Sequence, residues 1–419
     1  MIDIKELNNG IRLINEYMPD SHIFSIRFCA MVGSKNEREN EYGIAHLLEH
    51  MTFKSTAKQT TKQISETLDK LGGHFNAYTA QENTVFYVTT TTENAHETIE
   101  CLCDIFCNTT FDKKELASEK KVVCSEIKMY EDDYPIVCME NLIENLYDKP
   151  LGHNVAGSVD SVMNITPEML ADFKIRNYTS GRVIVSTAGG IKTEEIAEYL
   201  EKYLEKFSKA EKFSTYDLPE FQPTPKQRDV FQKKDTDQVY CYMSFKGCNK
   251  SNKITLTEAI LNTLLGGCMS SRLFVGVREE KGLVYHIASF PDRFSTSGCN
   301  MIRFFSNKEN AEKALIAIRE VLDTIKKDGF NEEELKKAKA ITKASVILDR
   351  EKVSHITSIN LAKYLYRQEK FDLDKELEKI NAITLDEVNE RVKEILDFDK
   401  MSFSIVAKEN TIQPSKFFE

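Results

Sequence analysis

The sequence of 419 residues contains the same order of predicted elements twice, about half a chain apart. In the first copy an alternating strand leads through a Glu-Asn-Ala turn into an amphipathic helix, and a second helix follows Phe111. The second copy repeats this order, with Glu309 in the place of Glu93 and Phe330 in the place of Phe111. A repeat of this length predicts two homologous halves rather than a solenoid of short units.

A polar segment rich in proline separates the predicted halves. Residues 209–229 contain three of the nine prolines and otherwise mostly polar side chains, which suits an exposed linker. We therefore expect an N-terminal domain over residues 1–208 and a homologous C-terminal domain over residues 230–419.

Strand and helix patterns occur in blocks within each half. Period-two runs such as residues 74–90 favour hairpins, and amphipathic helices follow the strands. This order predicts an α+β fold, in which each half is an antiparallel-rich mixed sheet with helices packed on one face.

Charge and hydropathy exclude several classes of protein. Lys and Arg total 56 and Asp and Glu total 66, and the net charge of −10 argues against a nucleic-acid partner. No run approaches the 18 apolar residues of a membrane span, and residues 1–17 lack the pattern of a secretory signal. The ten cysteines include no C-x-x-C pair and are too sparse for a disulfide scaffold, so we expect a cytoplasmic protein.

Two segments resemble functional motifs but have simpler interpretations. Cys101, Cys103 and Cys107 lie on a predicted amphipathic helix, where small core residues are expected rather than metal ligands. The glycine-rich segment LLGGCMSSRLF lacks the order of a phosphate-binding loop and predicts a tight turn before a helix.

A candidate metal site lies in residues 43–56, GIAHLLEHMTFKST. His46 and His50 are four residues apart, so on a helix their imidazoles share a face and can bind one ion. Glu49 reaches the same side and completes H-x-x-E-H, the inverse of the H-E-x-x-H zinc motif. Neutral imidazoles hold Zn²⁺ without cancelling its Lewis acidity, and the adjacent carboxylate can take a proton from water whose pKa the metal lowers.

The alternative interpretation places these three polar side chains on a solvent-exposed helix face. The neighbouring residues argue against it, because they are apolar: Ile44, Ala45, Leu47, Leu48, Met51 and Phe53. Ionisable groups within such a run are costly to bury unless they bind something.

A catalytic zinc site commonly has three protein ligands and one open position. The predicted helix after Phe111 offers Glu119 and Glu126, which are seven residues apart and share a face. When the second copy is aligned at its own phenylalanine, their counterparts are Ala338 and Ser345, and the counterpart of the histidine segment has neither His nor Glu. A purely structural role would not predict this one-sided loss, so the metal site is expected in the first half alone.

The chain resembles the pitrilysin/insulinase (M16) family of inverted zinc metallopeptidases, in particular short bacterial members similar to the mitochondrial processing peptidase. The resemblance covers nearly the whole chain and rests on collinear segments: NNGIRLI, HLLEHMTFKST, GGHFNAYTAQENTVFY, SEKKVVCSEIKMYEDDYP, PLGHNVAGS, GGCMSSRLF and VREEKGLVY. It implies a zinc-dependent endopeptidase with one Zn²⁺ per chain.

The resemblance also assigns roles at the metal site. His46 and His50 correspond to the two histidine ligands, and Glu126, at the family's spacing beyond His50, corresponds to the third ligand. Glu49 corresponds to the general base. Glu119 corresponds to a supporting carboxylate, which orients a ligating histidine.

Two further pairs of residues are implied by the resemblance. The segment GGHFNAYT matches an edge strand to which a substrate peptide adds, which places Asn76 and Ala77 at substrate-binding positions. An ordinary edge strand is the alternative. In the second half, Arg278 and Tyr285 match a pair whose donors suit a carbonyl oxygen that becomes an oxyanion.

In the family's short members two chains pair around a chamber. We therefore expect a homodimer, or a heterodimer with a related chain, that admits peptides or unfolded polypeptides. The alternative function is a non-catalytic substrate-binding subunit of a heterodimeric peptidase. Such subunits typically lose part of the zinc motif, which is complete in this chain. An α+β repeat protein with no site is a third interpretation, which the motif disfavours.

Overall fold

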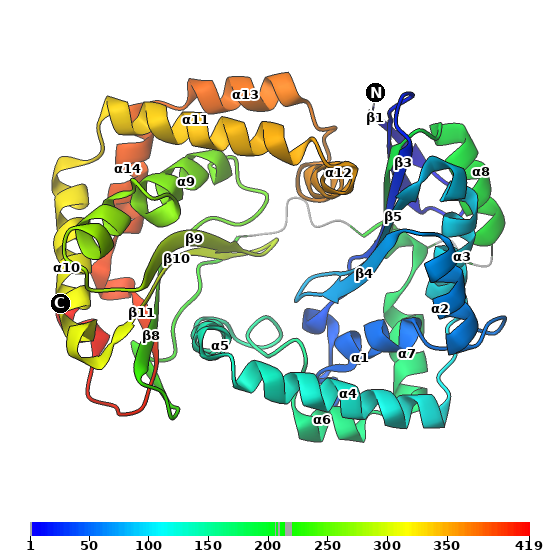
Figure 1. Cartoon of the computed structure of the whole chain (residues 1–419), viewed down its shortest axis with the longest axis horizontal. Helices are drawn as coiled ribbons and strands as arrows, with labels where there is room; N and C mark the ends of the chain where they lie inside the picture. The colour runs from blue at the N-terminus through cyan, green and yellow to red at the C-terminus, as the bar shows by residue number, and fades with distance from the viewer. Residues whose placement is uncertain (1, 206, 208–209, 214–219) are drawn as a thin grey trace. The chain divides into compact units, whose positions relative to one another are not determined.

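The computed structural model describes residues 2–205, 207, 210–213 and 220–419. The chain forms two compact units, each of which is a sheet with helices packed against it (Figure 1). The first unit comprises three stretches of chain, Met1–Lys128, Lys149–Tyr216 and Leu348–Phe371. The second unit comprises Met129–Asp148, Asp217–Ile347 and Asp372–Glu419.

The described residues of the first unit form a six-stranded mixed sheet in the order β1-β2-β6-β3-β5-β4. In chain order these strands are β1 (Ile2–Glu6), β2 (Arg12–Tyr17), β3 (Ile23–Ala30), β4 (His74–Thr79), β5 (Thr84–Thr91) and β6 (Val183–Gly189). β2 and β6 are parallel, whereas the other neighbouring strands are antiparallel. β4 is therefore an edge strand that pairs with β5 on one side.

The described strands of the second sheet repeat the order of β2-β6-β3-β5-β4 in the first, without a counterpart of β1. This repeated order confirms the duplication and the predicted α+β class. Its described strands run in the order β7-β11-β8-β10-β9, with β7 and β11 as the parallel pair. They are β7 (Asp229–Lys233), β8 (Gln238–Lys246), β9 (His286–Arg293), β10 (Gly298–Asn307) and β11 (Ser402–Ala407). The starts of β6 and β11 are separated by the same offset as Phe111 and Phe330, so the repeat of the sequence holds in the structure.

Helices fill the connections between the strands. In the first half they are α1 (Ile44–Thr52), α2 (Thr61–Lys70), α3 (Ala95–Asn108), α4 (Lys113–Glu131), α5 (Tyr134–Leu146), α6 (Val159–Asn164), α7 (Pro167–Asn177) and α8 (Thr193–Tyr203). In the second half they are α9 (Thr255–Asn262), α10 (Lys308–Asp328), α11 (Glu332–Asp349), α12 (Val353–Arg367), α13 (Leu373–Ala382) and α14 (Leu385–Ile395). None of the helices in the described ranges has the length and apolar content needed to cross a membrane.

Side-chain alternation along β3 shows how the first sheet is covered. Phe24, Ile26 and Phe28 enter the main core, where residues of α1 and α3 join them. The intervening residues face α12, and Arg27 Nε donates to Thr357 Oγ1 at 2.9 Å. The sheet is thus buried on both faces, by the helices of its own half on one side and by α12 on the other.

Each half of the sequence contributes one helix to the compact unit of the other half. The segment that contains α5 belongs to the second unit, and the segment that contains α12 belongs to the first. The compact units therefore differ from the continuous domains, residues 1–208 and 230–419, that the sequence predicted. Amphipathicity shows that a helix has an apolar face, but it does not specify which sheet covers that face.

A buried serine of the sheet contacts each exchanged helix. Ser186 of β6 is fully buried and its Oγ donates to the Thr357 carbonyl of α12 at 2.9 Å. On the second sheet Cys138 Sγ of α5 donates to the Ser404 carbonyl of β11 at 3.2 Å. Small residues allow the helix backbone to approach the sheet closely, and the repeat uses this device twice.

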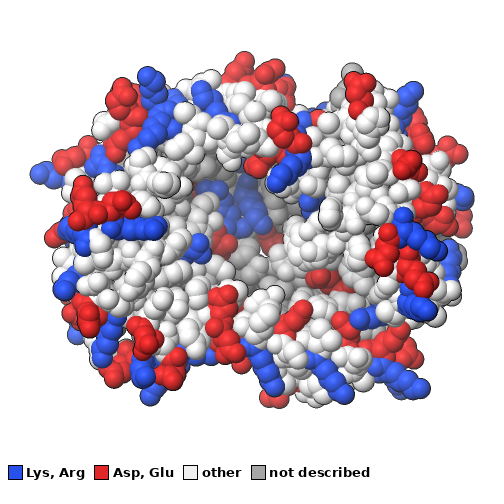
Figure 2. Space-filling model, viewed as in Figure 1, with Lys and Arg blue, Asp and Glu red and all other residues white. Residues whose placement is uncertain are grey.

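Part of the predicted linker, residues 209 and 214–219, lies outside the described residues. Its later part is anchored within the second unit, because Phe221 N donates to Thr296 O at 2.9 Å and Lys226 N donates to Asn145 O at 3.0 Å. Charged side chains of both signs are interspersed over the face drawn in Figure 2.

We expect Ser186→Leu to destabilise the first unit by about 1–3 kcal/mol, because the larger side chain overpacks the contact between β6 and α12. Ser186→Ala removes only the hydrogen bond to Thr357 and should cost about 1 kcal/mol. Urea unfolding followed by circular dichroism measures both changes. Equal losses for the two variants would contradict a closely packed contact.

Candidate metal centre

The helix α1 is short and mostly buried, which fixes its rotation. Seven of its nine residues are buried, and Ile44, Leu47, Leu48 and Met51 belong to the main core. Because these side chains pack into the core, the helical period directs His46, Glu49 and His50 toward α4 and β4. Asp112 caps the start of α4 through Oδ1, which accepts the Lys114 and Glu115 amides at 2.8 and 3.1 Å.

Three potential ligand atoms converge between α1 and α4. His46 Nε2 and His50 Nε2 are 3.3 Å apart. Glu126 Oε2 is 3.3 Å from His50 Nε2 and 3.9 Å from His46 Nε2. In the part of the chain that the structure describes, these residues form the one cluster of His, Cys, Asp and Glu side chains with metal-ligand spacing.

The geometry and chemistry of this cluster fit a zinc ion. Tetrahedral zinc with Zn–N bonds of about 2.0–2.1 Å separates its ligand atoms by about 3.3 Å, close to the distances here. Glu126 Oε2 is buried and has no hydrogen-bond partner, although two ring nitrogens face it. A buried acceptor without a donor is costly, and a cation between these atoms would satisfy it.

Glu119 takes a different position from Glu126. Its Oε1 accepts a hydrogen bond from His50 Nδ1 at 2.9 Å, and its Oε2 is 2.6 Å from Lys54 Nζ. Burial alone would raise the pKa of Glu119, but the contacts with His50 and Lys54 lower it. Because Glu119 holds the proton on Nδ1, the lone pair of His50 Nε2 points to the cluster.

The two imidazoles have different electrostatic environments. Burial, together with the charge of His50, lowers the pKa of His46 to about 4, so this ring is neutral at neutral pH. Burial also acts to lower the pKa of His50, but the hydrogen bond with Glu119 and the nearby carboxylates of Glu126 and Glu49 raise it overall.

Glu49 lies beside the cluster and is held by the end of the edge strand. Thr79 Oγ1, in the last residue of β4, donates to Glu49 Oε2 at 2.6 Å. Burial raises the pKa of Glu49, the Thr79 hydrogen bond counteracts this, and the charge of Glu126 adds to the increase. A buried carboxylate with a raised pKa is suited to accept a proton from a reacting water.

The edge strand β4 carries Asn76 and Ala77. Asn76 pairs with Tyr87 and Ala77 with Phe86 in the β5 register, and Asn76 is exposed. The Ala77 amide donates to Asn76 Oδ1 at 2.8 Å. The opposite edge of β4 has no neighbouring strand among the described residues, which is the geometry required for adding an extended peptide.

The remaining site residues of the sequence prediction belong to the second unit. Arg278 lies in a π-helical stretch, Phe274–Glu279, with its guanidinium carbon 4.8 Å from the Phe274 ring centroid. Tyr285 is 60% exposed, and its amide donates to Phe305 O at 2.8 Å. The structure thus groups His46, Glu49, His50, Glu119 and Glu126 in one unit and places this pair in the other.

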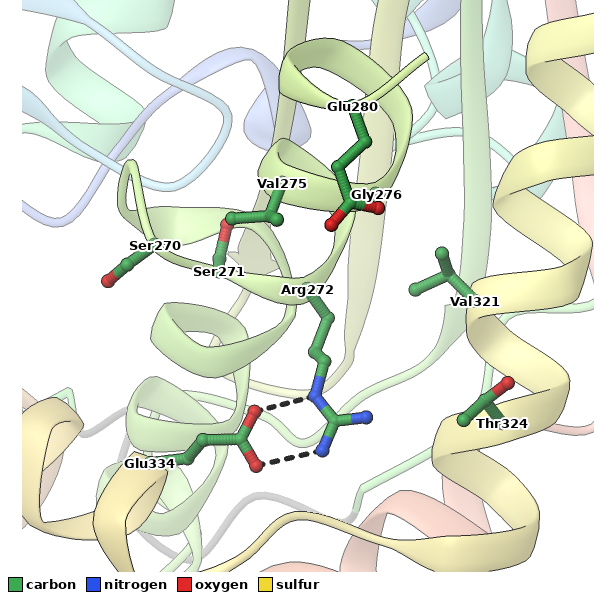
Figure 3. A pocket seen from close by; sticks show the side chains of 9 residues that line it. All are labelled: Ser270, Ser271, Arg272, Val275, Gly276, Glu280, Val321, Thr324 and Glu334. Atoms are coloured by element: carbon green, nitrogen blue, oxygen red, sulfur yellow. Dashed lines mark hydrogen bonds and ion pairs between the residues drawn. The ribbon is translucent and has the colours of Figure 1, made fainter.

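The cysteine segment of α3 lies in the core, and the glycine-rich segment LLGGCMSSRLF forms a turn, as their simpler interpretations predicted. Burial raises the pKa of the Cys101 thiol to about 11, and Cys103 is also buried in α3. The glycine-rich segment bends between helical stretches beside a cavity of about 320 Å³ in the second unit (Figure 3). There Arg272 Nε and Nη2 bind the two Glu334 oxygens at 2.5 and 2.8 Å, so its charge is already paired.

Sequence reasoning missed Thr79 and Lys54. Both lie in segments that it singled out, HFNAYT and HMTFKST, but in neither segment does spacing along the chain show what a hydroxyl or ammonium group contacts. These partners come from other elements, Glu49 of α1 for Thr79 and Glu119 of α4 for Lys54.

Most of the chain matches two family models. Residues 12–159 match the model described as insulinase (peptidase family M16), and residues 164–342 match the peptidase M16 inactive domain. The uncharacterized zinc protease YmxG of Bacillus subtilis is 32% identical over 400 residues, which cover 95% of this chain and 97% of the relative. An uncharacterized zinc protease of Rickettsia felis is 32% identical over 358 residues, which cover 84% and 85%.

Solved structures share the fold. A peptidase M16 inactive domain structure from Pseudomonas fluorescens has a TM-score of 0.89 at 19% identity, with coverage of 99% of this chain and 100% of that chain. A protease from Helicobacter pylori has a TM-score of 0.88 at 21% identity, with coverage of 97% and 99%.

We expect Glu119→Gln to weaken zinc binding by about 10–100-fold, because it loosens the orientation of His50. Lys54→Met should produce a smaller loss, since it removes the partner of Glu119 only. Glu115→Gln is the matched control on the same helix, because Glu115 binds Ser55 and Thr61 rather than a histidine. Competition with a chromophoric chelator measures the dissociation constants, and equal affinity for all three variants would refute this role of Glu119.

Proposed function

Since this chain belongs to the insulinase family of peptidases (M16), we propose that it is a zinc-dependent endopeptidase that hydrolyses peptides and unfolded segments. The observation that carries the proposal is the convergence of three ligand atoms, His46 Nε2, His50 Nε2 and Glu126 Oε2, beside a buried glutamate.

The chemistry follows from the placement of these groups. His46, His50 and Glu126 would hold the metal. A bound zinc ion would supply Lewis acidity, which polarises a peptide carbonyl and lowers the pKa of water. Thr79 donates to Oε2 of Glu49, which leaves Oε1 to accept the proton of the attacking water. As the C–N bond breaks, Glu49 returns this proton to the departing amine nitrogen.

The edge strand β4 supplies a binding mode for extended chains. Its outer backbone edge would pair with a peptide around Asn76 and Ala77, where the Ala77 amide would exchange its bond to Asn76 Oδ1 for one to the peptide. Such pairing gives affinity with little dependence on side chains. Phe75 and Tyr78 of the same strand are 43% and 45% exposed, on alternating sides, and offer apolar contacts to substrate side chains. The backbone groups of strands inside a folded protein are already paired, so we expect unfolded segments as substrates.

The second unit would contribute to the transition state through Arg278 and Tyr285. A guanidinium and a phenol are suitable donors to a carbonyl oxygen that gains negative charge. We further propose a homodimer that forms a closed chamber, or a heterodimer with a related chain, and a cytoplasmic location, where the ten free cysteines stay reduced.

We expect Glu49→Gln to lower kcat/KM at least about 100-fold while leaving zinc bound, because the amide cannot accept the proton. Turnover of a mixed quenched-fluorescence peptide library and the metal content are measured on both proteins. Zinc near one per chain in both, with cleavage by the wild type only, supports the proposal.

Other outcomes of this experiment separate the alternatives. Bound zinc without cleavage by the wild type would favour the non-catalytic subunit, which is then tested by adding a related active chain. No zinc bound after zinc is supplied would overturn the metal site itself.

We expect Thr79→Val to lower kcat about tenfold with little change in KM, since it frees Glu49 to adopt other orientations. Thr79→Ser keeps the hydroxyl and should retain activity near the wild-type value. Steady-state kinetics on one cleavable peptide measure both constants. A loss in KM alone would show that Thr79 binds substrate rather than orienting Glu49.

A further inference from the structure

A buried carboxylate lies at the start of α1, the helix that carries His46 and His50. The Glu37 side chain is 0% exposed. Its Oε1 accepts the Ala45 amide at 2.9 Å, and its Oε2 accepts the Gly43 amide at 3.0 Å. His153 Nε2 also donates to Oε2, at 2.8 Å. We call these two side chains, Glu37 and His153, the bracket.

The bracket replaces the cap that α1 lacks. The N-cap residue is Gly43, which has no side chain to accept an amide hydrogen. The first amides of a helix have no partner inside the helix, and a negative charge near them is favourable. Glu37 supplies the hydrogen-bond partner and the carboxylate from six residues upstream of Gly43. One of the two amides that it accepts belongs to Ala45, directly before the ligand His46.

The loop that carries His153 is packed tightly against the same helix start. The imidazole of His153 lies 4.2 Å from the Tyr42 ring, centroid to centroid. A Cβ added to Gly43, which has φ of +90°, would be 2.5 Å from Ala156 O. A Cβ added to Gly157, with φ of +72°, would be 2.5 Å from Tyr42 O. The loop and the helix start therefore hold each other in place.

The half that lacks the metal ligands also lacks the bracket. Whether the two copies are aligned at their Glu-Asn-Ala turns or at their phenylalanines, the positions that answer to Glu37 and His153 carry other residues: Lys253, Leu256, Glu369 and Asp372. The repeated sheet forms without this pair, so the fold itself does not require it.

We propose that Glu37 and His153 are positioning residues, which fix the start of α1 so that His46 and His50 present their Nε2 atoms at the spacing of a zinc site. This inference rests on the proposed function. His46 lies in the first turn of this nine-residue helix, so loosening that turn would move His46 relative to His50 and Glu126. The bracket acts through the helix backbone and does not touch the metal-binding atoms.

The test compares four variants with the wild-type chain. Glu37→Gln and His153→Phe remove the carboxylate and the donor, whereas His153→Gln retains a donor. Arg176→Met is the control, because it breaks another ion pair of the first unit, the 2.7 Å contact with buried Glu41. The readouts are the zinc dissociation constant by chelator competition, the visible spectrum of the cobalt-substituted protein, and the melting temperature of the metal-free protein.

We expect Glu37→Gln and His153→Phe to weaken zinc binding by about 10–100-fold and to change the cobalt spectrum. His153→Gln should bind zinc nearly as the wild type does. Arg176→Met should lower the melting temperature without changing zinc affinity or spectrum. This pattern separates positioning of the ligands from a general loss of stability.

The contrary results are distinct. Unchanged zinc affinity and spectrum in Glu37→Gln and His153→Phe would overturn the positioning role, even with a lower melting temperature. Equal losses in His153→Gln and His153→Phe would overturn the role of the hydrogen bond. Failure of the wild type to bind zinc would instead overturn the proposed function.

Discussion

Burial of the apolar side of α1 against the first sheet is the constraint on which the candidate site depends. Leu47, Leu48 and Met51 are fully buried, so the helix cannot rotate without exposing them. The same rotation fixes where His46, Glu49 and His50 point. Other elements then add further groups: α4 supplies Glu119 and Glu126, and β4 supplies Thr79. Rigid elements place such groups more accurately than loops do.

The duplication separates what the fold needs from what the chemistry needs. Both halves build the same order of five strands, to which the first half adds β1, and α4 corresponds to α11 when the copies are aligned at Phe111 and Phe330. In this alignment Ala338 and Ser345 replace Glu119 and Glu126 of α4, and the second sheet still forms. Exposed apolar residues persist in the same alignment, with Val122 matched by Ile341 and Met129 by Leu348. The fold of the repeat therefore does not require Glu119 and Glu126, whose positions at the metal cluster explain them instead.

The sequence predicted the fold class and the repeat because both leave periodic, local patterns. It also singled out His46, His50 and the two glutamates, since the helical spacing brings such side chains to one face. The exchange of α5 and α12 left no local pattern, because either sheet can bury an apolar helix face. The partners of Thr79, Lys54 and Glu37 were missed for a related reason. Each contact joins residues from separate elements, and hydrogen bonds of this kind are set by tertiary structure.

The charges around His46 and His50 favour a bound cation. Glu49, Glu119 and Glu126 surround the two imidazoles, and among the described residues Lys54 contacts this group through Glu119. Three ionised carboxylates and one ammonium leave a net charge of −2, which a divalent cation would neutralise. Without such a cation, burial and the charge of Glu126 both raise the pKa of Glu49 and oppose its ionisation. A nearby divalent charge favours the ionised form, so the same cation that the ligand atoms fit would also keep Glu49 able to accept a proton.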